Sequence, residues 1–350
     1  MIRIYHISAI VWGLWTISPA AAAPLCPAMP DGLACKAGSS GLAIAETADD
    51  AMRFAAAIDE SARLFQAHFS RPAPSLALIA APERFVALKD QLQTDLAMPW
   101  LARHASFSRA IGDALRETLR KSMPDLTPAA IEAEIDKKLA EIGGAQNREE
   151  GVIAHEACHT RFIKAYAFSS AESGGAQSHY GGSAPDWLDE TAAILCEDAK
   201  TTADRRRQFA LQRQGKFQGR IWPMRHFLEM AHPLAQEDAH LLTEAKKEAA
   251  AEGRSDGAFK ITIYKGDEAK ALIGNSNAPS FYLQARVFAD FLIETTKTEN
   301  IFGSIAEGYA AGRTFNDWLA ENGAANGLPT DIAAFEAKWE AYLTHHYPIG

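Results

Sequence analysis

The chain has 350 residues, 47% hydrophobic and 23% charged, which is globular composition long enough for one large domain or two modest ones. Its formal net charge is −9 and no block of lysine and arginine stands out, which excludes strong attraction to nucleic acid or anionic lipid. Alanine is abundant and β-branched runs are rare, so we expect more helix than sheet.

Residues 1–22 have the pattern of an export signal. The apolar run ISAIVWGLW follows one arginine and precedes the small residues of SPAAAAP. Cleavage after Ala22 is favoured, because cleavage after Ala23 would place Pro24 at the scissile bond. A retained membrane anchor is the alternative, but the apolar run is short and is interrupted by Ser18 and Pro19. We therefore expect an exported protein, periplasmic or secreted, that is soluble after cleavage.

The rest of the chain predicts a helix-rich α+β fold. Residues 23–45 are expected to form an N-terminal segment, 46–300 the main domain, and 301–350 a helical extension of that domain. Hydrophobic periodicity predicts helices at 46–69, 82–92, 107–141, 149–168, 186–200 and 281–294, and short strands at 75–80 and 260–266. Residues 169–185 are rich in glycine and serine, which predicts a mobile loop.

Residues 155–159 read HEACH, which places two histidines one helical turn apart. His155 and His159 can therefore direct imidazole nitrogens to one zinc ion, at about 2.0–2.1 Å each. Glu156 lies about 100° round the helix, where it could reach a water molecule beside the metal. The alternative is an ordinary helix with two satisfied histidines. Val152 and Phe162 favour a buried helix, in which unpaired polar side chains would be costly.

A third ligand is needed, and residues 185–198 (PDWLDETAAILCED) offer one on a second helix. Pro185 precedes this helix, Asp186 is expected to cap its N-terminus, and Glu190 follows one turn later. Asp189 competes with Glu190 for the ligand role. A solvated acid in the first helical turn, favoured by the helix dipole, is the other interpretation of Glu190. The sequence TRFIKA after His159 excludes a further histidine ligand there.

HEACH followed by PDWLDETAA resembles the gluzincin metallopeptidases, whose second motif commonly reads W-L-x-E-G-x-A. The resemblance implies His155, His159 and Glu190 as ligands of one zinc ion, with Glu156 as general base. It also implies Tyr282 as the donor to the oxyanion, and a thermolysin-like catalytic domain in which a small mixed sheet precedes the zinc helix and a helical part follows. It extends over roughly residues 70–300, but only the two zinc motifs are specific.

The chain departs from the family pattern in several places. Thirty residues separate His159 from Glu190, more than in the best-known members, and Thr191 replaces the usual glycine. The aminopeptidase branch carries a G-A-M-E-N motif, whereas residues 143–147 read GGAQN and lack its glutamate. Recognition of a free amino terminus is therefore unsupported.

Other histidines and tyrosines are weaker candidates. Tyr282 could equally be a partly buried core residue. His179 and Tyr180 are its rivals, since their loop could close over a substrate. Four histidines have no metal-binding spacing and are interpreted as surface or structural residues: His226, His232, His345 and His346.

The positions of the cysteines predict one disulfide, and they do not decide whether a second one forms. Cys26 and Cys35 flank a loop rich in proline and glycine that suits closure. Cys158 and Cys196 lie within the two zinc motifs, so converging helices would bring them close. Against this bridge, Cys196 lies about 240° round a continuous helix from Glu190, and Cys158 could be a small buried hydrophobe.

These observations predict an exported zinc-dependent hydrolase that cleaves peptide bonds in a peptide or protein substrate. The alternative is a non-catalytic exported binding protein in which zinc joins two helices. Glu156 argues against the alternative, because a purely structural metal site needs no base. Neither substrate specificity nor oligomeric state follows from the sequence.

Overall fold

The structure is a computed structural model that describes residues 25–30, 32–92, 96–100, 115–117, 119–121, 123, 126–142, 146–168, 183–233 and 277–349. The predicted export signal, the predicted strand at 260–266, and both His179 and Tyr180 lie outside these ranges. Within the described ranges, no helix combines the length and the apolar character needed to cross a membrane.

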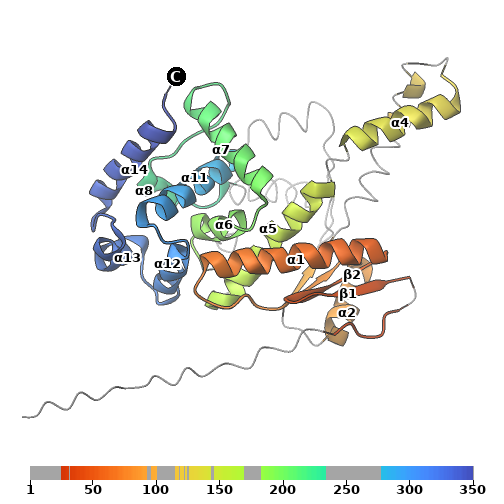
Figure 1. Ribbon diagram of the computed structural model, residues 1–350, viewed down its shortest axis with the longest axis horizontal. Coiled ribbons are helices and arrows are strands. Elements are labelled where there is room, and N and C mark those ends of the chain that lie inside the picture. Colours follow the sequence, from red (N-terminus) through yellow and green to blue (C-terminus); the bar gives the residue numbers. More distant parts are fainter. Residues whose placement is uncertain are drawn as a thin grey trace, which may run out of the picture.

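A small mixed sheet and a larger set of helices form an α+β fold, as predicted (Figure 1). The strands are β1 (Ala34–Ala37), β2 (Gly41–Ala45), β3 (Leu76–Ile79) and β4 (Ala97–Pro99), in the order β1-β2-β3-β4. β2 pairs antiparallel with β1 and parallel with β3, which pairs parallel with β4. Residues assigned from the sequence to an N-terminal segment thus supply β1 and β2.

Helices cover both faces of this sheet. α1 (Ala48–His68) is capped at its N-terminus by Thr47, whose side chain accepts a hydrogen bond from the backbone N–H of Asp50. Phe54 and Ile58 of α1 pack with Leu76 and Leu78 of β3 on one face. Because side chains alternate along a strand, Ala77 and Ile79 face the other side. There they pack with Leu88 of α2 (Phe85–Leu92), which follows a short 3-10 turn at Pro82–Arg84 (Figure 1).

α5 (Gln146–Tyr166) connects the sheet to the helical part of the molecule. Ile153 and Ala157 pack into the cluster formed by the sheet and α1. Cys158 and Phe162 pack into the larger helical core instead. Two different faces of α5 are therefore buried, which fixes the rotation of the helix about its axis. The face that carries the histidines is fixed with it.

The remaining helices surround α11 (Ala278–Thr296), which is buried along most of its length. The face predicted for it is confirmed, since Phe281, Ala285, Phe288 and Leu292 are all buried. The other helices are α6 (Asp186–Ile194), α7 (Ala199–Arg213), α8 (Met224–Glu229), α12 (Ile301–Ala310), α13 (Phe315–Asn322) and α14 (Ile332–His346), with a 3-10 turn at Ala324–Asn326.

The predicted helix at 186–200 is wrong as a single element. α6 ends at Ile194 and α7 begins at Ala199, after Asp198, whose carboxylate accepts a hydrogen bond from Thr201 N–H and caps the new helix. α5 approaches this cap closely, because a Cβ atom at Gly151 would lie 3.0 Å from Asp198 Oδ2. The chain therefore turns between the two helices, directly beside α5.

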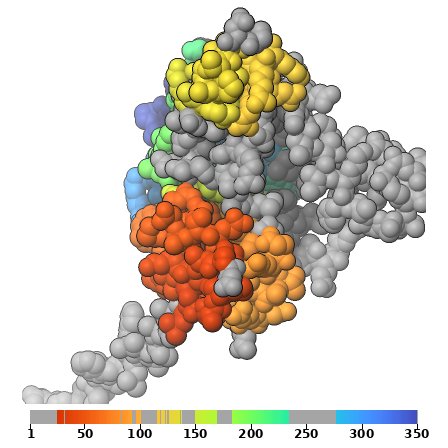
Figure 2. Space-filling model, turned by 90° about the vertical axis from the view of Figure 1, so that its right-hand side faces the viewer, coloured from red at the N-terminus to blue at the C-terminus, as the bar shows by residue number. Residues whose placement is uncertain are grey.

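The predicted helix at 107–141 is also interrupted, because α4 spans only Pro128–Ile142 and the chain before it is not helical at residues 123, 126 and 127. Ile131 and Ile135 of α4 form a small cluster with Leu119, separate from the main core. Figure 2 shows α4 in yellow and the residues around the sheet in red to orange at opposite ends of one face.

Both candidate disulfides are present. Cys26 is bonded to Cys35 and Cys158 to Cys196, with Cα–Cα distances of 5.8 and 6.4 Å. The helical-phase argument against the second bond fails because α6 ends before Cys196. Cys196 lies in the turn, where helical phase no longer sets its direction.

Titration of the unfolded, unreduced protein should therefore find no free thiol. On the loop-entropy model, Cys158→Ala/Cys196→Ala should lower the free energy of unfolding by about 4 kcal/mol, because the bond closes a loop with a sequence separation of 38. Cys26→Ala/Cys35→Ala, with a separation of 9, is the control and should cost about 3 kcal/mol in urea denaturation. Two titratable thiols in the protein would contradict one of the bonds.

Candidate metal centre

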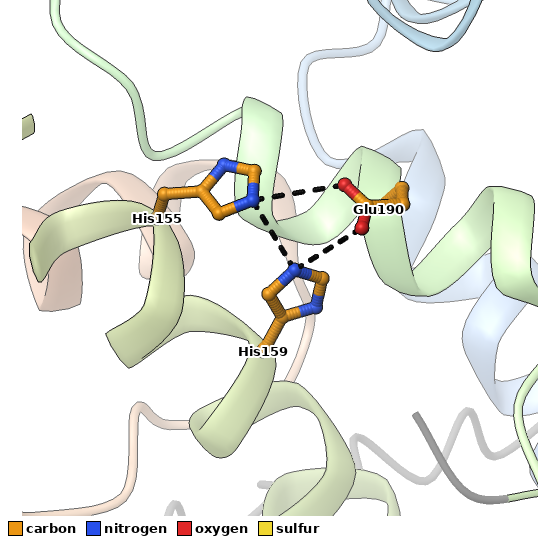
Figure 3. A group of neighbouring side chains, drawn as sticks. All are labelled: His155, His159 and Glu190. Carbon is orange, nitrogen blue, oxygen red and sulfur yellow. Dashed lines mark hydrogen bonds and ion pairs between the residues drawn. The ribbon is translucent and has the colours of Figure 1, made fainter. Parts of the chain in front are cut away.

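α5 brings the two motif histidines to one point (Figure 3). The Nε2 atoms of His155 and His159 lie 3.3 Å apart, and the two rings are nearly perpendicular at 79°. This follows from their spacing, because residues four apart share one face of a helix. The two side chains are only 13% and 10% exposed.

α6 supplies a carboxylate opposite these nitrogens (Figure 3). Glu190 Oε2 lies 3.7 Å from His155 Nε2, and Glu190 Oε1 lies 3.5 Å from His159 Nε2. One donor atom of each residue can be chosen so that all lie within 4.8 Å of one another. The structure thus brings together the three residues predicted as ligands.

The geometry of these donors fits a zinc ion. Two ligands about 2.0–2.1 Å from a tetrahedral zinc lie about 3.3–3.4 Å from each other. The separation of 3.3 Å between the Nε2 atoms of His155 and His159 matches this value. Nitrogen and carboxylate oxygen are also donors that zinc accepts. Other divalent metals accept the same donors, so the donor set alone does not select zinc.

Each histidine has a carboxylate at its outer nitrogen. His155 Nδ1 lies 3.0 Å from Glu197 Oε1, and His159 Nδ1 lies 2.9 Å from Asp189 Oδ1. A carboxylate at Nδ1 holds the proton there and leaves Nε2 as an electron-pair donor. Both rings are therefore oriented, and held in the tautomer, that metal binding requires.

This arrangement distinguishes Asp189 from Glu190. Asp189 is buried and contacts the outer nitrogen of His159, whereas Glu190 faces the inner nitrogens of both histidines. Glu190 is therefore the carboxylate placed as a ligand, and Asp189 orients a ligand.

Glu190 carries its negative charge in a buried position. Burial opposes ionisation, but the charges of His159, His155 and His232 outweigh it and hold the pKa of Glu190 well below its usual range. Burial likewise opposes protonation of His159, but Asp189 and Glu190 raise its pKa. Among the described residues, no hydrogen-bond donor satisfies Glu190 Oε2. A buried carboxylate oxygen without a donor is what a bound cation would complete.

Glu197 and Arg205 belong to the site although no sequence motif indicated them. Arg205 donates from Nε to Glu197 Oε2 at 2.5 Å and from Nη2 to Glu197 Oε1. Burial would raise the pKa of Glu197, but the hydrogen bonds from Arg205 and His155 lower it. Glu197 lies in the turn between α6 and α7 and contacts His155 from there.

His232 is a third residue that the sequence did not place at the site. It is fully buried, with its Nε2 atom 3.5 Å from Glu190 Oε1, rather than on the surface. Its backbone N–H donates to Asp186 Oδ2 at 2.6 Å, so Asp186 holds this segment instead of capping α6. The other three histidines interpreted as surface or structural are exposed: His226, His345 and His346.

The predicted catalytic side chains lie beside the ligands. Tyr282 of α11 is half-buried, with its ring centroid 6.3 Å from that of His155 and 5.4 Å from that of His232. Glu156 is half-buried next to His155 on α5. Tyr282 is therefore a neighbour of the candidate metal centre, and it also packs, partly buried, against the helical core.

Comparison with known proteins adds no assignment, because no protein-family model, curated protein or solved structure matches this chain. The chemistry must therefore be argued from the site itself. Three residues of the site could hold a metal ion: His155, His159 and Glu190. The carboxylate of Glu156, the phenol of Tyr282 and the imidazole of His232 lie beside them.

Glu190→Ala should abolish stoichiometric zinc binding, because two imidazoles alone do not form a stable site. In the presence of zinc, the variant should also melt at a lower temperature than the wild type, since the free energy of zinc binding contributes to folding. Asp189→Asn should retain zinc with an affinity lowered by about 10–100-fold, as expected for a residue that orients a ligand. Elemental analysis and titration against a chelating dye measure both effects. If Glu190→Ala keeps full zinc occupancy while Asp189→Asn loses it, the two roles are reversed.

Proposed function

We propose that this protein is an exported, zinc-dependent peptidase with a gluzincin-like catalytic domain. The observation that carries the proposal is the set of His155, His159 and Glu190 donors on two helices, with Glu156 adjacent on the first. The two disulfides are compatible with export, since such bonds persist in oxidising compartments.

The order of elements supports the gluzincin-like fold. A small mixed sheet precedes α5, which carries HExxH, and α6 carries the glutamate ligand. α11, which carries Tyr282, packs against α6 and α7. This is the arrangement that the resemblance in the two motifs implies.

In the proposed reaction, Glu156 accepts a proton from the water molecule that attacks the peptide carbonyl, and then passes it to the leaving amine. When bound, zinc supplies Lewis acidity, which polarises the carbonyl and lowers the pKa of water. Tyr282 donates a hydrogen bond to the carbonyl oxygen as negative charge develops on it. His232, whose ring lies beside that of Tyr282, is the competing donor.

Glu156→Gln should retain zinc and lose about 10²–10⁴-fold in kcat, because the side chain serves the water rather than the metal. The assay is hydrolysis of a denatured protein and of a peptide library, with and without a chelator, beside elemental analysis of the same sample. Wild-type protein that binds zinc but cleaves nothing in a broad library would instead support the non-catalytic binding protein.

Tyr282→Phe should lower kcat by about 10²–10³-fold with KM nearly unchanged, because loss of one donor to the oxyanion destabilises the transition state. His232→Gln is the comparison variant. The same steady-state assay decides between them. A larger fall in kcat for His232→Gln, with zinc retained, would make His232 the donor.

A further inference from the structure

We propose that Arg205 is a positioning residue that links the metal ligand His155 to Tyr282 through a single guanidinium group. The proposal rests on the proposed function for the role of Tyr282, whereas the link to His155 needs only a metal centre. Neither motif contains Arg205, which lies on α7, nor does the mechanism above use it.

The first half of the link is the ion pair with Glu197. Arg205 binds both carboxylate oxygens, and one of these oxygens also lies 3.0 Å from His155 Nδ1. The Glu197 side chain is 4% exposed and that of Arg205 18% exposed, so water competes little with this contact. A buried carboxylate held at two points has little rotational freedom. Arg205 thus fixes the oxygen that orients His155.

The second half of the link is the contact with Tyr282. The Arg205 Cζ atom lies over the Tyr282 ring, 5.2 Å from its centroid, within the range of a cation–π interaction. The guanidinium group is planar, so it can donate from its edge to Glu197 while a face contacts the ring. The direction of the Tyr282 ring is therefore tied to the ion pair.

Lysine cannot replace arginine in both contacts. An ammonium group can neutralise Glu197, but it has neither the two-pronged edge nor the flat face of a guanidinium. Arg205→Lys thus preserves the charge and removes the shared geometry. It separates a positioning role from a purely electrostatic one.

Arg206, the next residue of α7, provides a matched control. Arg206 forms a two-point ion pair with Asp290, at 2.7 and 2.8 Å, which resembles the Arg205 pair in chemistry but lies away from the histidines. Arg206→Lys therefore makes the same change, from guanidinium to ammonium, in another two-point ion pair of the same helix. It reports the cost of disturbing α7 without disturbing the metal centre.

The test measures both ends of the link without using activity. Zinc affinity is measured by competition with a chelating dye. The position of Tyr282 is measured by fluorine NMR of metal-free protein containing 3-fluorotyrosine, with the Tyr282 resonance assigned from Tyr282→Phe. The variants are Arg205→Lys, Glu197→Gln and Arg206→Lys, each checked for native folding by circular dichroism.

Arg205→Lys should weaken zinc binding by about 10–100-fold, the effect typical of removing support from a ligand. It should also shift the Tyr282 resonance. Glu197→Gln breaks the link at its other end and should change the zinc affinity and the Tyr282 resonance in the same direction. It replaces Arg205→Lys as the test variant if Arg205→Lys does not fold. Arg206→Lys should change neither.

Zinc affinity within twofold of wild type in Arg205→Lys, or an unmoved Tyr282 resonance, overturns the proposal, because the link requires both effects. Equal effects of Arg206→Lys also overturn it, since they would reflect general disturbance of α7. Failure of the peptidase proposal is seen separately, as absence of hydrolysis by the zinc-loaded wild type. The affinity and resonance readouts remain valid in that case.

Discussion

The site depends on one buried negative charge, that of Glu190. An ionised carboxylate removed from water is costly unless it is paired, and here its partners are imidazoles from another helix. This interaction joins α5 to α6, and through His232 it also joins the segment that follows α8. The orientation of each helix at the centre is therefore set by electrostatics as well as by apolar packing.

Apolar packing and the Cys158–Cys196 disulfide make this charged arrangement possible. α5 is buried on two faces, and the bond holds it to the turn after α6, directly beside Glu197. The backbone that carries the donors is thus fixed by interactions that do not involve a metal. A centre organised in this way is preformed, so little ordering of the chain would accompany the binding of a metal. This differs from small zinc domains, which fold only when the metal binds.

The parts of the site set by local periodicity could be predicted from the sequence. HExxH on a helix determines the approach of the two Nε2 atoms by itself, and Glu190 was accessible through the second motif. The buried face of α11 and the strand β3 follow from similar patterns, whereas β1, β2 and β4 were not predicted from periodicity. Each of these predictions needs only residues that lie near one another in the chain.

Residues whose position depends on chain breaks or distant segments could not be predicted. Glu197 contacts His155 from the turn after Ile194. Its spacing of seven residues from Glu190 is that of one helical face, but the spacing alone does not identify His155 as its partner. His232 reaches Glu190 because Asp186 holds its backbone, a contact between residues 46 positions apart. The link from Arg205 to Tyr282 joins α7 to α11, so periodicity carries no signal for it. A histidine or arginine that belongs to no motif has no second residue at a regular sequence spacing from which its partner could be inferred.

The charges around the histidines explain why these distant residues are needed. Glu190, Asp189 and Glu197 all contact the imidazoles, and among the residues that the structure describes only Glu197 has a permanent cation, Arg205, as its partner. Two negative charges therefore remain, which a divalent cation would neutralise while both imidazoles stay uncharged. Without a metal, a proton on His159 offsets part of this charge, in agreement with the raised pKa of that residue. A divalent metal would compete with a proton for Nε2 of His159, and Arg205 neutralises the charge that Glu197 would otherwise add.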